Sequence, residues 1–395
     1  MKRHALVLAC LGLALPACAA DAEQAWQGSV AAEVWAYTTQ LQGRGDSPLN
    51  PDNRLAKLAG SQATAEARIN LRWRDEESDL VLRPRLLRSD AAGEAYLSQG
   101  FLRTRLDSSL TLTAGRELLS WGPANFRSPS HPIYFDAGRS NPLREVSGVD
   151  LVRINLNSGE SGATLARVVS RGHLDAQAAP GAMSLAKFDL RGEAALASLI
   201  VAGPVYGAAF VGGYAQATLG EAWLVYGEFG SGRRAQSPRA GTGLVGAAYT
   251  LENGQSVALE ALHDAHGYGR EEIRRYFADA SALAAQYRAA PEAGTAAAAL
   301  RGLGQVLSQA PALLGRDYGH LLWQSNPQEG ERYWRLMLTR NFQDRSSQLG
   351  LYLESSLSPR LSAFLAATRN LGGAGSEFSA LWRTSLVAGV KCFLF

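Results

Sequence analysis

Hydrophobic and polar residues alternate strictly between residues 63 and 74. The apolar members are Ala65, Ala67, Ile69, Leu71 and Trp73, and the polar members are Glu66, Arg68, Asn70, Arg72 and Arg74. Successive side chains of a strand point to opposite faces of a sheet, so this period predicts a strand with one apolar and one charged face. In a soluble sandwich the charged face would be the outside. In a transmembrane barrel it would face the lumen, with Trp73 near the lipid–water boundary.

Similar alternating runs recur along the chain, separated by turns. They cover residues 29–39, 80–86, 94–106, 110–117, 149–155, 164–171, 221–229, 244–251, 257–264, 331–342 and 384–395. Asn253-Gly254 is a hairpin signal between two of them. Residues 194–215 carry no charge, but Gly203-Pro204 interrupts them. We therefore expect two strands that meet there rather than a membrane helix.

Two segments depart from the period of two. Residues 121–148 contain four prolines, which forbid regular strand pairing, and a loop of this length usually has a function. This loop either stays extracellular or folds into the barrel and narrows it. Residues 270–314 carry apolar residues at helical spacing, with a break at residues 291–294, and predict a helical insertion between strands.

The N-terminus predicts export. A basic start at Met1-Lys2-Arg3-His4, an apolar run and small residues up to Ala20 indicate a signal peptide over residues 1–20. Cys18 leaves a lipoprotein signal as the alternative. Cys392 is then the one cysteine of the mature chain, which excludes an intramolecular disulfide and a cysteine metal cluster. Residues 21–395 are expected to form a single domain.

Arginine provides nearly all of the positive charge. Lysine and arginine together number 39, and the only lysines are Lys2, Lys57, Lys187 and Lys391. In the first part of the chain most arginines lie inside the predicted strands, whereas most acids lie in the turns. Arginine presents a planar fork of donors to carboxylates and phosphates. The composition therefore indicates a positioned cationic surface.

The C-terminal strand carries a family resemblance. The chain ends Val390-Lys391-Cys392-Phe393-Leu394-Phe395, and Phe395, Phe393 and Val387 alternate, with Lys391 in an apolar place. This ending resembles the assembly signal of Gram-negative outer-membrane β-barrels. The resemblance implies an all-β fold, a transmembrane antiparallel barrel, in which we count about sixteen strands, with fourteen to eighteen open.

A finer resemblance rests on two short motifs. Gly115-Arg116-Glu117, followed by Trp121-Gly122 and the proline-rich loop, is similar to porins of the phosphate-selective or alginate-export kind. The porin resemblance implies a pore for small hydrophilic solutes, in which the charge of the lumen sets the ion preference.

The candidate site residues follow from these expectations. The predicted pore-lining residues are Arg68, Arg72, Arg74, Arg83, Arg85, Arg103, Arg105, Arg153, Arg167, Glu228, Glu260 and Asp264. If the loop folds inward, its constriction residues are Arg127, Asp136, Arg139, Arg144 and Glu145. We expect the arginines to form a ladder that selects anions, and the three acids of the later strands to form an opposing wall.

Two other functions stay open. The helical insertion could plug the barrel, which would then bind or export a polymer or partner. An outer-membrane hydrolase would need a general-base pair such as His131 with Asp136 or His263 with Asp264, and a nucleophile such as Ser128 or Ser130. Phosphate-loop, zinc-binding and dinucleotide motifs are absent from the sequence, so we expect no enzyme activity, cofactor or metal.

The expected partners follow from the resemblance. They are outer-membrane lipid and lipopolysaccharide, the barrel assembly machinery and small anionic solutes. Nucleic acid is not expected, because the basic residues alternate on strands and nothing in the sequence places them in the cytosol. Association with further copies of the chain stays open.

Overall fold

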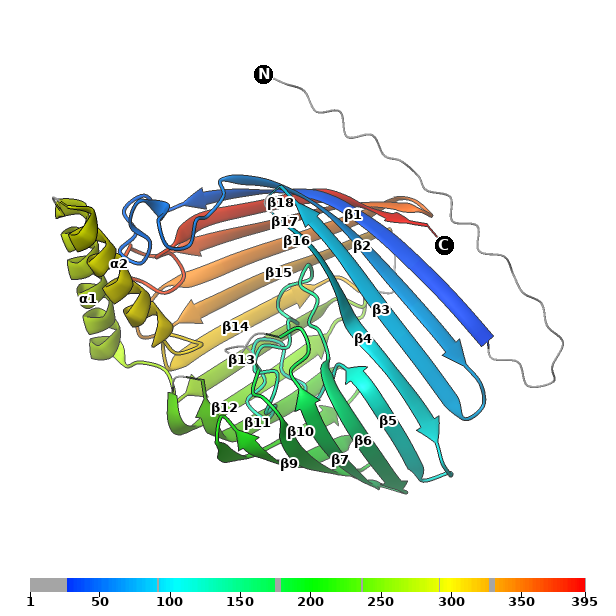
Figure 1. Ribbon diagram of the computed structural model, residues 1–395. Helices are drawn as coiled ribbons and strands as arrows, with labels where there is room; N and C mark the ends of the chain where they lie inside the picture. The colour runs from blue at the N-terminus through cyan, green and yellow to red at the C-terminus, as the bar shows by residue number, and fades with distance from the viewer. Residues whose placement is uncertain are drawn as a thin grey trace.

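A closed antiparallel β-barrel forms the body of the molecule (Figure 1). The computed structural model describes residues 27–90, 92–174, 179–235, 237–290, 292–326 and 331–394. Within these residues the eighteen strands are β1 (Gln27–Gly43), β2 (Ser61–Arg74), β3 (Ser78–Ser89), β4 (Gly93–Arg105), β5 (Leu110–Glu117), β6 (Val149–Ser158), β7 (Ser161–Ser170), β8 (Met183–Arg191), β9 (Ala195–Val205), β10 (Ala208–Leu219), β11 (Trp223–Arg234), β12 (Ser237–Thr250), β13 (Ser256–Asp264), β14 (Asp317–Gln324), β15 (Arg332–Asn341), β16 (Ser347–Ser358), β17 (Leu361–Leu371) and β18 (Trp382–Phe393). Each strand pairs with its neighbours in sequence, and β1 closes the barrel against β18. The predicted fold class is confirmed, with two strands more than the sixteen we counted.

The sequence analysis did not identify β8 and β14 as strands, whereas the two strands expected within residues 194–215 are confirmed as β9 and β10. β8 ends at Arg191 and β9 begins at Ala195, so a short turn at Gly192 separates two strands that the sequence pattern does not divide. Inward positions of β9 and β10, such as Ile200, Val205 and Phe210, are themselves apolar and buried. The alternation of polar and apolar residues is hidden there because both faces of these strands carry apolar side chains.

The two ends of the barrel differ. At one end the connections are the short segments 75–77, 106–109, 159–160, 192–194, 220–222, 251–255, 325–331 and 359–360; the other end carries the long segments 44–60, 118–148 and 265–316. We call these the short-turn end and the long-loop end. Bacterial outer-membrane barrels have short periplasmic turns and longer extracellular loops. Both ends of the described chain, Gln27 and Leu394, belong to the short-turn end.

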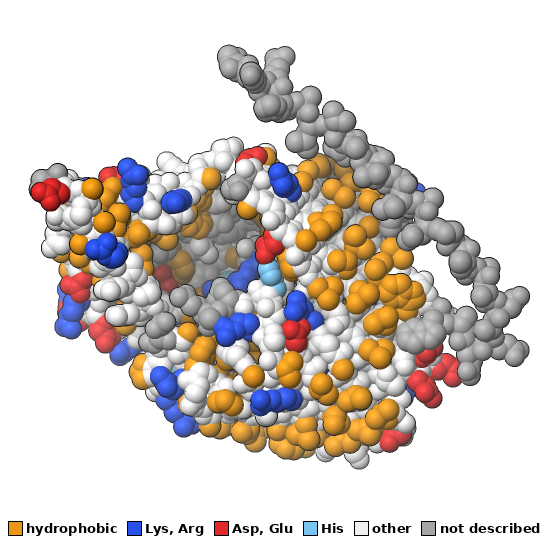
Figure 2. All heavy atoms as spheres, in the orientation of Figure 1, with side chains coloured by type: hydrophobic (Ala, Val, Ile, Leu, Met, Phe, Trp, Pro, Cys, Tyr) orange, Lys and Arg blue, Asp and Glu red, His pale blue; other side chains and the backbone are white. Residues whose placement is uncertain are grey.

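The outside of the wall is apolar. Figure 2 shows hydrophobic side chains gathered over the strands that face the viewer. Five aromatic residues mark the short-turn end of this outer face: Trp73, Trp223, Tyr249, Trp323 and Trp334. Trp223 lies 4.8 Å from Tyr249, and Trp323 lies 5.0 Å from Trp334, between ring centroids. Aromatic girdles of this kind occur where a membrane barrel meets the interface.

The last strand corrects one expectation. Lys391 does not stand among the apolar outward residues, because its Nζ donates to Glu354 Oε2 at 2.7 Å and to Tyr352 Oη at 3.0 Å on the inner face. The outward residues of this stretch are Leu386, Val390 and Leu394, all exposed. The apolar alternation is therefore shifted by one residue from the pattern we used. Phe395 and the predicted signal peptide, residues 1–20, lie outside the described residues.

The predicted helical insertion is confirmed as a pair of helices, α1 (Arg270–Ala289) and α2 (Ala293–Ser308). Figure 1 shows the pair beyond the long-loop ends of the strands. Phe277 of α1 and Leu303 of α2 are buried in a cluster with Leu49 and Ala380 of two other loops. The helices thus pack on the neighbouring loops and not between the barrel walls. In the described part of the chain, no helix is long and apolar enough to cross a membrane.

Candidate functional site

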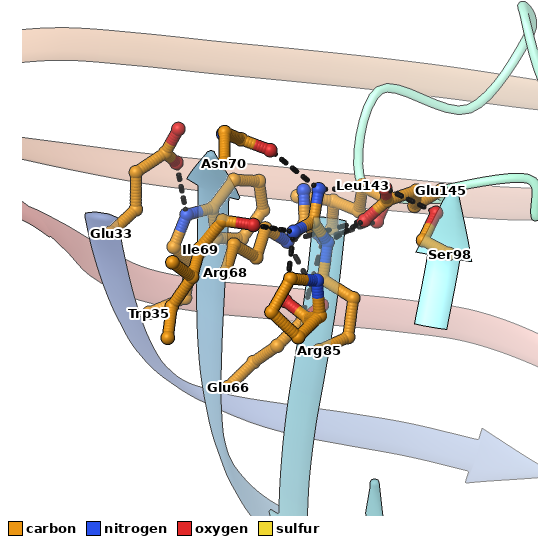
Figure 3. A network of polar contacts seen from close by, with 11 residues as sticks. Glu33, Trp35, Glu66, Arg68, Ile69, Asn70, Arg85, Ser98, Leu143 and Glu145 are labelled. Atoms are coloured by element: carbon orange, nitrogen blue, oxygen red, sulfur yellow. Dashed lines mark hydrogen bonds and ion pairs between the residues drawn. The ribbon is translucent and has the colours of Figure 1, made fainter. Parts of the chain in front are cut away.

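Residues 118–148, between β5 and β6, fold into the barrel, and we call them the internal loop. Near its C-terminal end, Glu145 accepts two hydrogen bonds from Arg85 of β3, at 2.6 Å from Nε and 2.9 Å from Nη2 (Figure 3). Ser98 Oγ of β4 donates to the same carboxylate at 2.7 Å. The Arg85 side chain is only 4% exposed. A two-pronged, buried pair of this type fixes both position and orientation.

Two carboxylates of the opposite wall hold the first half of the internal loop. Glu228 of β11 and Glu260 of β13 are 4% and 2% exposed and accept hydrogen bonds from this segment. The donors to Glu228 are Ala124 N at 2.9 Å, Ser128 Oγ at 2.6 Å and Ser130 Oγ at 2.7 Å, and the donors to Glu260 are Asn125 N at 2.6 Å and Phe126 N at 2.8 Å. Backbone N–H groups that no strand partner satisfies are thus paired by buried acids.

Apolar packing and one further hydrogen bond complete the attachment. Ile133 and Tyr134 of the internal loop pack with Met183 and Ile200 of the wall in one buried cluster. On the far side, Arg335 Nη1 of β15 donates to the carbonyl oxygen of Arg139 at 2.7 Å. The loop is therefore bonded to β3, β11, β13 and β15, and it crosses the interior between them.

His131 of the internal loop has a structural role, because both of its ring nitrogens contact backbone groups of the loop. His131 accepts backbone hydrogen bonds from Ile133 and Tyr134 at Nδ1, both at 3.1 Å, and its Nε2 lies 3.0 Å from the carbonyl of Leu119. Burial lowers the pKa of His131 to about 3, so the ring is neutral at physiological pH.

The two acids of the loop stay ionised. Burial acts to raise the pKa of Asp136, but Arg127 at 3.4 Å and Arg144 at 2.7 Å outweigh it and hold the pKa below its ordinary value. Burial also acts to raise the pKa of Glu145, and the hydrogen bonds from Arg85 and Ser98 lower it overall. Both carboxylates therefore act as fixed negative charges that hold cations in place.

The histidine–aspartate pairs considered for hydrolysis are not formed. His131 has its ring nitrogens on backbone groups, as described above. His263 is paired with Asp317 at 2.7 Å and is exposed. Asp264 instead contacts Arg234 and, at 2.9 Å, His266. Within the described residues, no three His, Cys, Asp or Glu side chains are grouped so that they could hold a metal ion.

Most arginines of the predicted ladder lie on the inner face, but they are paired with acids. Arg68 is 2.9 Å from Glu66, Arg72 is 2.6 Å from Asp79, and Arg74 is 3.9 Å from the same aspartate. Arg103 and Arg153 each lie 2.7 Å from Glu117. The expected cationic ladder is thus a series of ion pairs. Glu66 reaches Arg68 on the same strand, and Asp79 and Glu117, near strand ends, reach arginines of adjacent strands.

Arg83, Arg105 and Arg335 of the inner face and Arg139 of the internal loop have no carboxylate partner among the described residues. Arg83 and Arg105 occupy the face opposite the outward residues Leu86 and Leu102. Arg139 donates to the backbone carbonyls of residues 122 and 124, at 2.7 and 3.0 Å. These guanidinium groups carry the positive charge that the interior does not neutralise locally.

The remaining candidates lie elsewhere. Arg167 is on the outer face between the exposed residues Leu165 and Val169, because the parity of β7 turns it away from the lumen. Glu228, Glu260 and Asp264 do point inward, but they are almost fully buried. The expected acidic wall opposite the arginines is therefore not exposed at these three positions, since the first two acids bind the internal loop and Asp264 is bonded to neighbouring side chains.

One inward cluster was missed by the sequence analysis. The ring of Trp35 lies between two cations, with Arg68 Cζ at 3.6 Å and Lys391 Nζ at 4.3 Å from its centroid. Its Nε1 donates to Glu33 at 2.7 Å (Figure 3). Attraction of cations to an aromatic face explains this stacking. The spacing of two residues between Glu33 and Trp35 could have indicated that they share a face of the strand. The cluster was missed because our prediction placed Lys391 on the opposite face.

A cavity of about 370 Å³ remains between the internal loop and the wall formed by β14 to β18. Arg127, Asp136 and Arg144 line it from the loop, and His320 and Tyr352 line it from the wall. Figure 2 shows the molecule hollowed beside the helical insertion, at the long-loop end. The interior is therefore narrowed by the loop but keeps solvent-sized space lined with polar groups.

Comparisons with known proteins agree on the fold. No protein-family model and no curated protein matches the sequence. Among solved structures, Pseudomonas aeruginosa OccK11 (OpdR) aligns with a TM-score of 0.57 at 12% identity, covering 94% of this chain and 98% of that one. A triple mutant of the Rhodopseudomonas blastica porin aligns at 10% identity over 93% and 100% of the two chains, with a TM-score of 0.46 that is too low to carry an argument. The chain has the fold of a porin-like β-barrel.

Proposed function

We propose that the protein is an outer-membrane channel for passive diffusion of small hydrophilic solutes. The observation that carries the proposal is a closed barrel with an apolar outside, an ionised inside and an internal loop that leaves a cavity beside it. A water-filled interior is the environment that such charges require in a membrane, because lipid cannot solvate them.

We further propose that the channel prefers anions. The supporting argument is an asymmetry of exposure: Glu228 and Glu260 are covered by the internal loop, whereas Arg83, Arg105 and Arg335 have no carboxylate partner within the described residues. Rings and rows of basic residues favour anions in pores. The pore-lining role of the paired arginines Arg68, Arg72, Arg74, Arg103 and Arg153 is part of the same proposal, whereas Arg85 is buried against Glu145 of the internal loop.

Reversal potentials across a planar bilayer with a salt gradient test the preference. The variant with Arg83, Arg105 and Arg335 changed to glutamine keeps polar bulk and removes three positive charges. Its anion-to-cation permeability ratio should fall relative to the unchanged protein, most clearly at low salt, because screening has a length of about 8 Å at physiological salt.

A matched control removes three arginines from outside the lumen: Arg88, Arg340 and Arg369, also changed to glutamine. This variant should keep the selectivity of the unchanged channel. Cation preference of the unchanged protein, or an equal shift in both triple variants, would rule out the proposed role of the inward arginines.

A further inference from the structure

The outer face of the barrel carries arginines at its long-loop end. The outward arginines near the ends of strands that run towards the long loops include Arg88, Arg116, Arg167, Arg340 and Arg369 of β3, β5, β7, β15 and β17. Their neighbours on the same face are exposed apolar residues such as Leu86, Leu165, Leu338 and Leu371. We call these five residues the outer arginine belt.

Most of the belt lacks an acidic partner. Arg116 is neutralised by Asp150, at 2.7 and 3.0 Å. Arg167 and Arg340 donate only to serine hydroxyls, at 3.1 and 3.0 Å. For Arg88 and Arg369 the described part of the chain provides no ion pair or side-chain hydrogen bond. Four exposed guanidinium groups therefore keep donors available beside an apolar wall.

The outer face at the short-turn end carries aromatic residues in place of most of the arginines. It carries the aromatic residues described above and a single outward arginine within the described strands, Arg332. A cation beside lipid is costly unless it reaches the headgroup region and meets an anion there. Arginine binds phosphate with two parallel hydrogen bonds, which a lipid acyl chain cannot offer. The distribution of arginine therefore matches a leaflet rich in phosphate at the long-loop end.

A hollow in the wall lies next to the belt. It is lined by Val34, Ala65, Ala67, Leu86 and Gly93, and Arg88 stands among the residues of its rim. Small side chains leave room for an acyl chain against the strands, while Arg88 remains free to contact a headgroup. Charge and shape thus point to the same occupant at this position.

We propose that the outer arginine belt binds the phosphate groups of a phosphorylated lipid in the outer leaflet, with one acyl chain in the hollow beside Arg88. The proposal rests on the proposed membrane location, but it does not depend on conduction or ion selectivity. If the folded, conducting channel binds phosphorylated lipid no more tightly than dephosphorylated lipid, the proposed lipid site is wrong. The proposed function as a channel is then unaffected.

Binding of bisphosphorylated lipid A to the purified, detergent-solubilised full-length protein tests this directly. Native mass spectrometry compares it with the same lipid after removal of both phosphates. The phosphorylated lipid should bind at least about tenfold more tightly, because charge-assisted hydrogen bonds are stronger than hydrogen bonds between neutral groups. A tenfold difference in affinity needs only a modest gain in binding free energy. Raising the salt concentration should reduce this difference, since exposed charges are screened.

The variant R88Q/R167Q/R340Q/R369Q should lose most of the phosphate-dependent difference, whereas R332Q, an outward arginine at the short-turn end, should retain it. Equal binding of the two lipids by the unchanged protein would overturn the proposal, and this comparison needs no variant to fold. Equal loss in R332Q would also overturn it. So would a change of oligomeric state in the fourfold variant without any effect of lipid phosphate, because the belt would then be a contact between copies of the chain.

Discussion

At the residue scale, Glu145 is the most informative side chain of the interior. Its carboxylate joins the internal loop to β3 and β4 through Arg85 and Ser98. Removing one partner of a buried pair costs about 3–5 kcal/mol, because the other charge is left without compensation. Attachment of this end of the loop should therefore depend on Glu145 more than on any single exposed contact.

The substitution Glu145→Gln tests that dependence. It keeps the shape but leaves Arg85 buried without a counterion, so the loop should detach more often and the open-channel current should become noisier. Asp46→Asn is the matched control, since Asp46 also accepts from an arginine but is 60% exposed and lies in the segment between β1 and β2. Quiet, unchanged currents in the Glu145 variant would show that the loop is held by other contacts.

Acid should disturb the loop only at low pH. The pKa of Glu145 is lowered in the folded protein, so its contribution to loop attachment is complete above the ordinary value of about 4.3 and is lost as pH falls through the lowered value. Current noise recorded from pH 7 downward should stay constant to about pH 5 and increase only below about pH 4. An increase that begins near pH 6 would point to a histidine instead.

The residue scale also shows what sequence could predict. Strict alternation in β2 correctly indicated which side chains share a face, because the period of a strand is a local property. It could not indicate that Arg72 meets Asp79 or that Arg85 meets Glu145, since these contacts depend on register and on the path of a distant loop. For the same reason Glu228 and Glu260 were assigned to an open wall that the internal loop in fact covers.

At the element scale, the helical pair and the proline-rich loop were both recognisable from their period and composition. β8 was not recognised, although β9 and β10 were correctly expected as two strands that meet near Gly203-Pro204. In this region the packing of the internal loop makes part of the inner face apolar, which weakens the alternation. In β18 the lysine at a position that we expected to be apolar was the correct signal. Lys391 lies on the inner face, so the predicted alternation of this strand was displaced by one residue.

The helical pair should be separable from the barrel. Leu303 is 0% exposed between the helices, so Leu303→Arg should open the pair and increase trypsin cleavage within residues 270–308. The barrel should still migrate faster on gels before heating than after. Ala298→Arg, at an exposed position of the same helix, should leave cleavage unchanged. Loss of the heat-dependent mobility shift in Leu303→Arg alone would show that the insertion is needed for closure of the barrel.

At the scale of the whole molecule, the distribution of side chains is what supports transport. Apolar residues face outward, aromatic residues mark the short-turn end, and charged residues with an anchored loop occupy the interior. The sequence predicted the apolar outside and the charged inside, because both follow from local alternation, but it left open whether the loop folds inward. The remaining width of the lumen could not be predicted, because it is set by how far the internal loop crosses between the walls.

The most direct test of the central claim is solute influx into liposomes that contain the purified, heat-modifiable protein. Passive diffusion predicts that vesicles swell with small hydrophilic solutes, at rates proportional to the concentration gradient and without saturation. Small anionic solutes should enter faster than cationic solutes of equal size. Vesicles that contain correctly folded barrel and admit no small solute of either charge would contradict the account of this protein as an open channel.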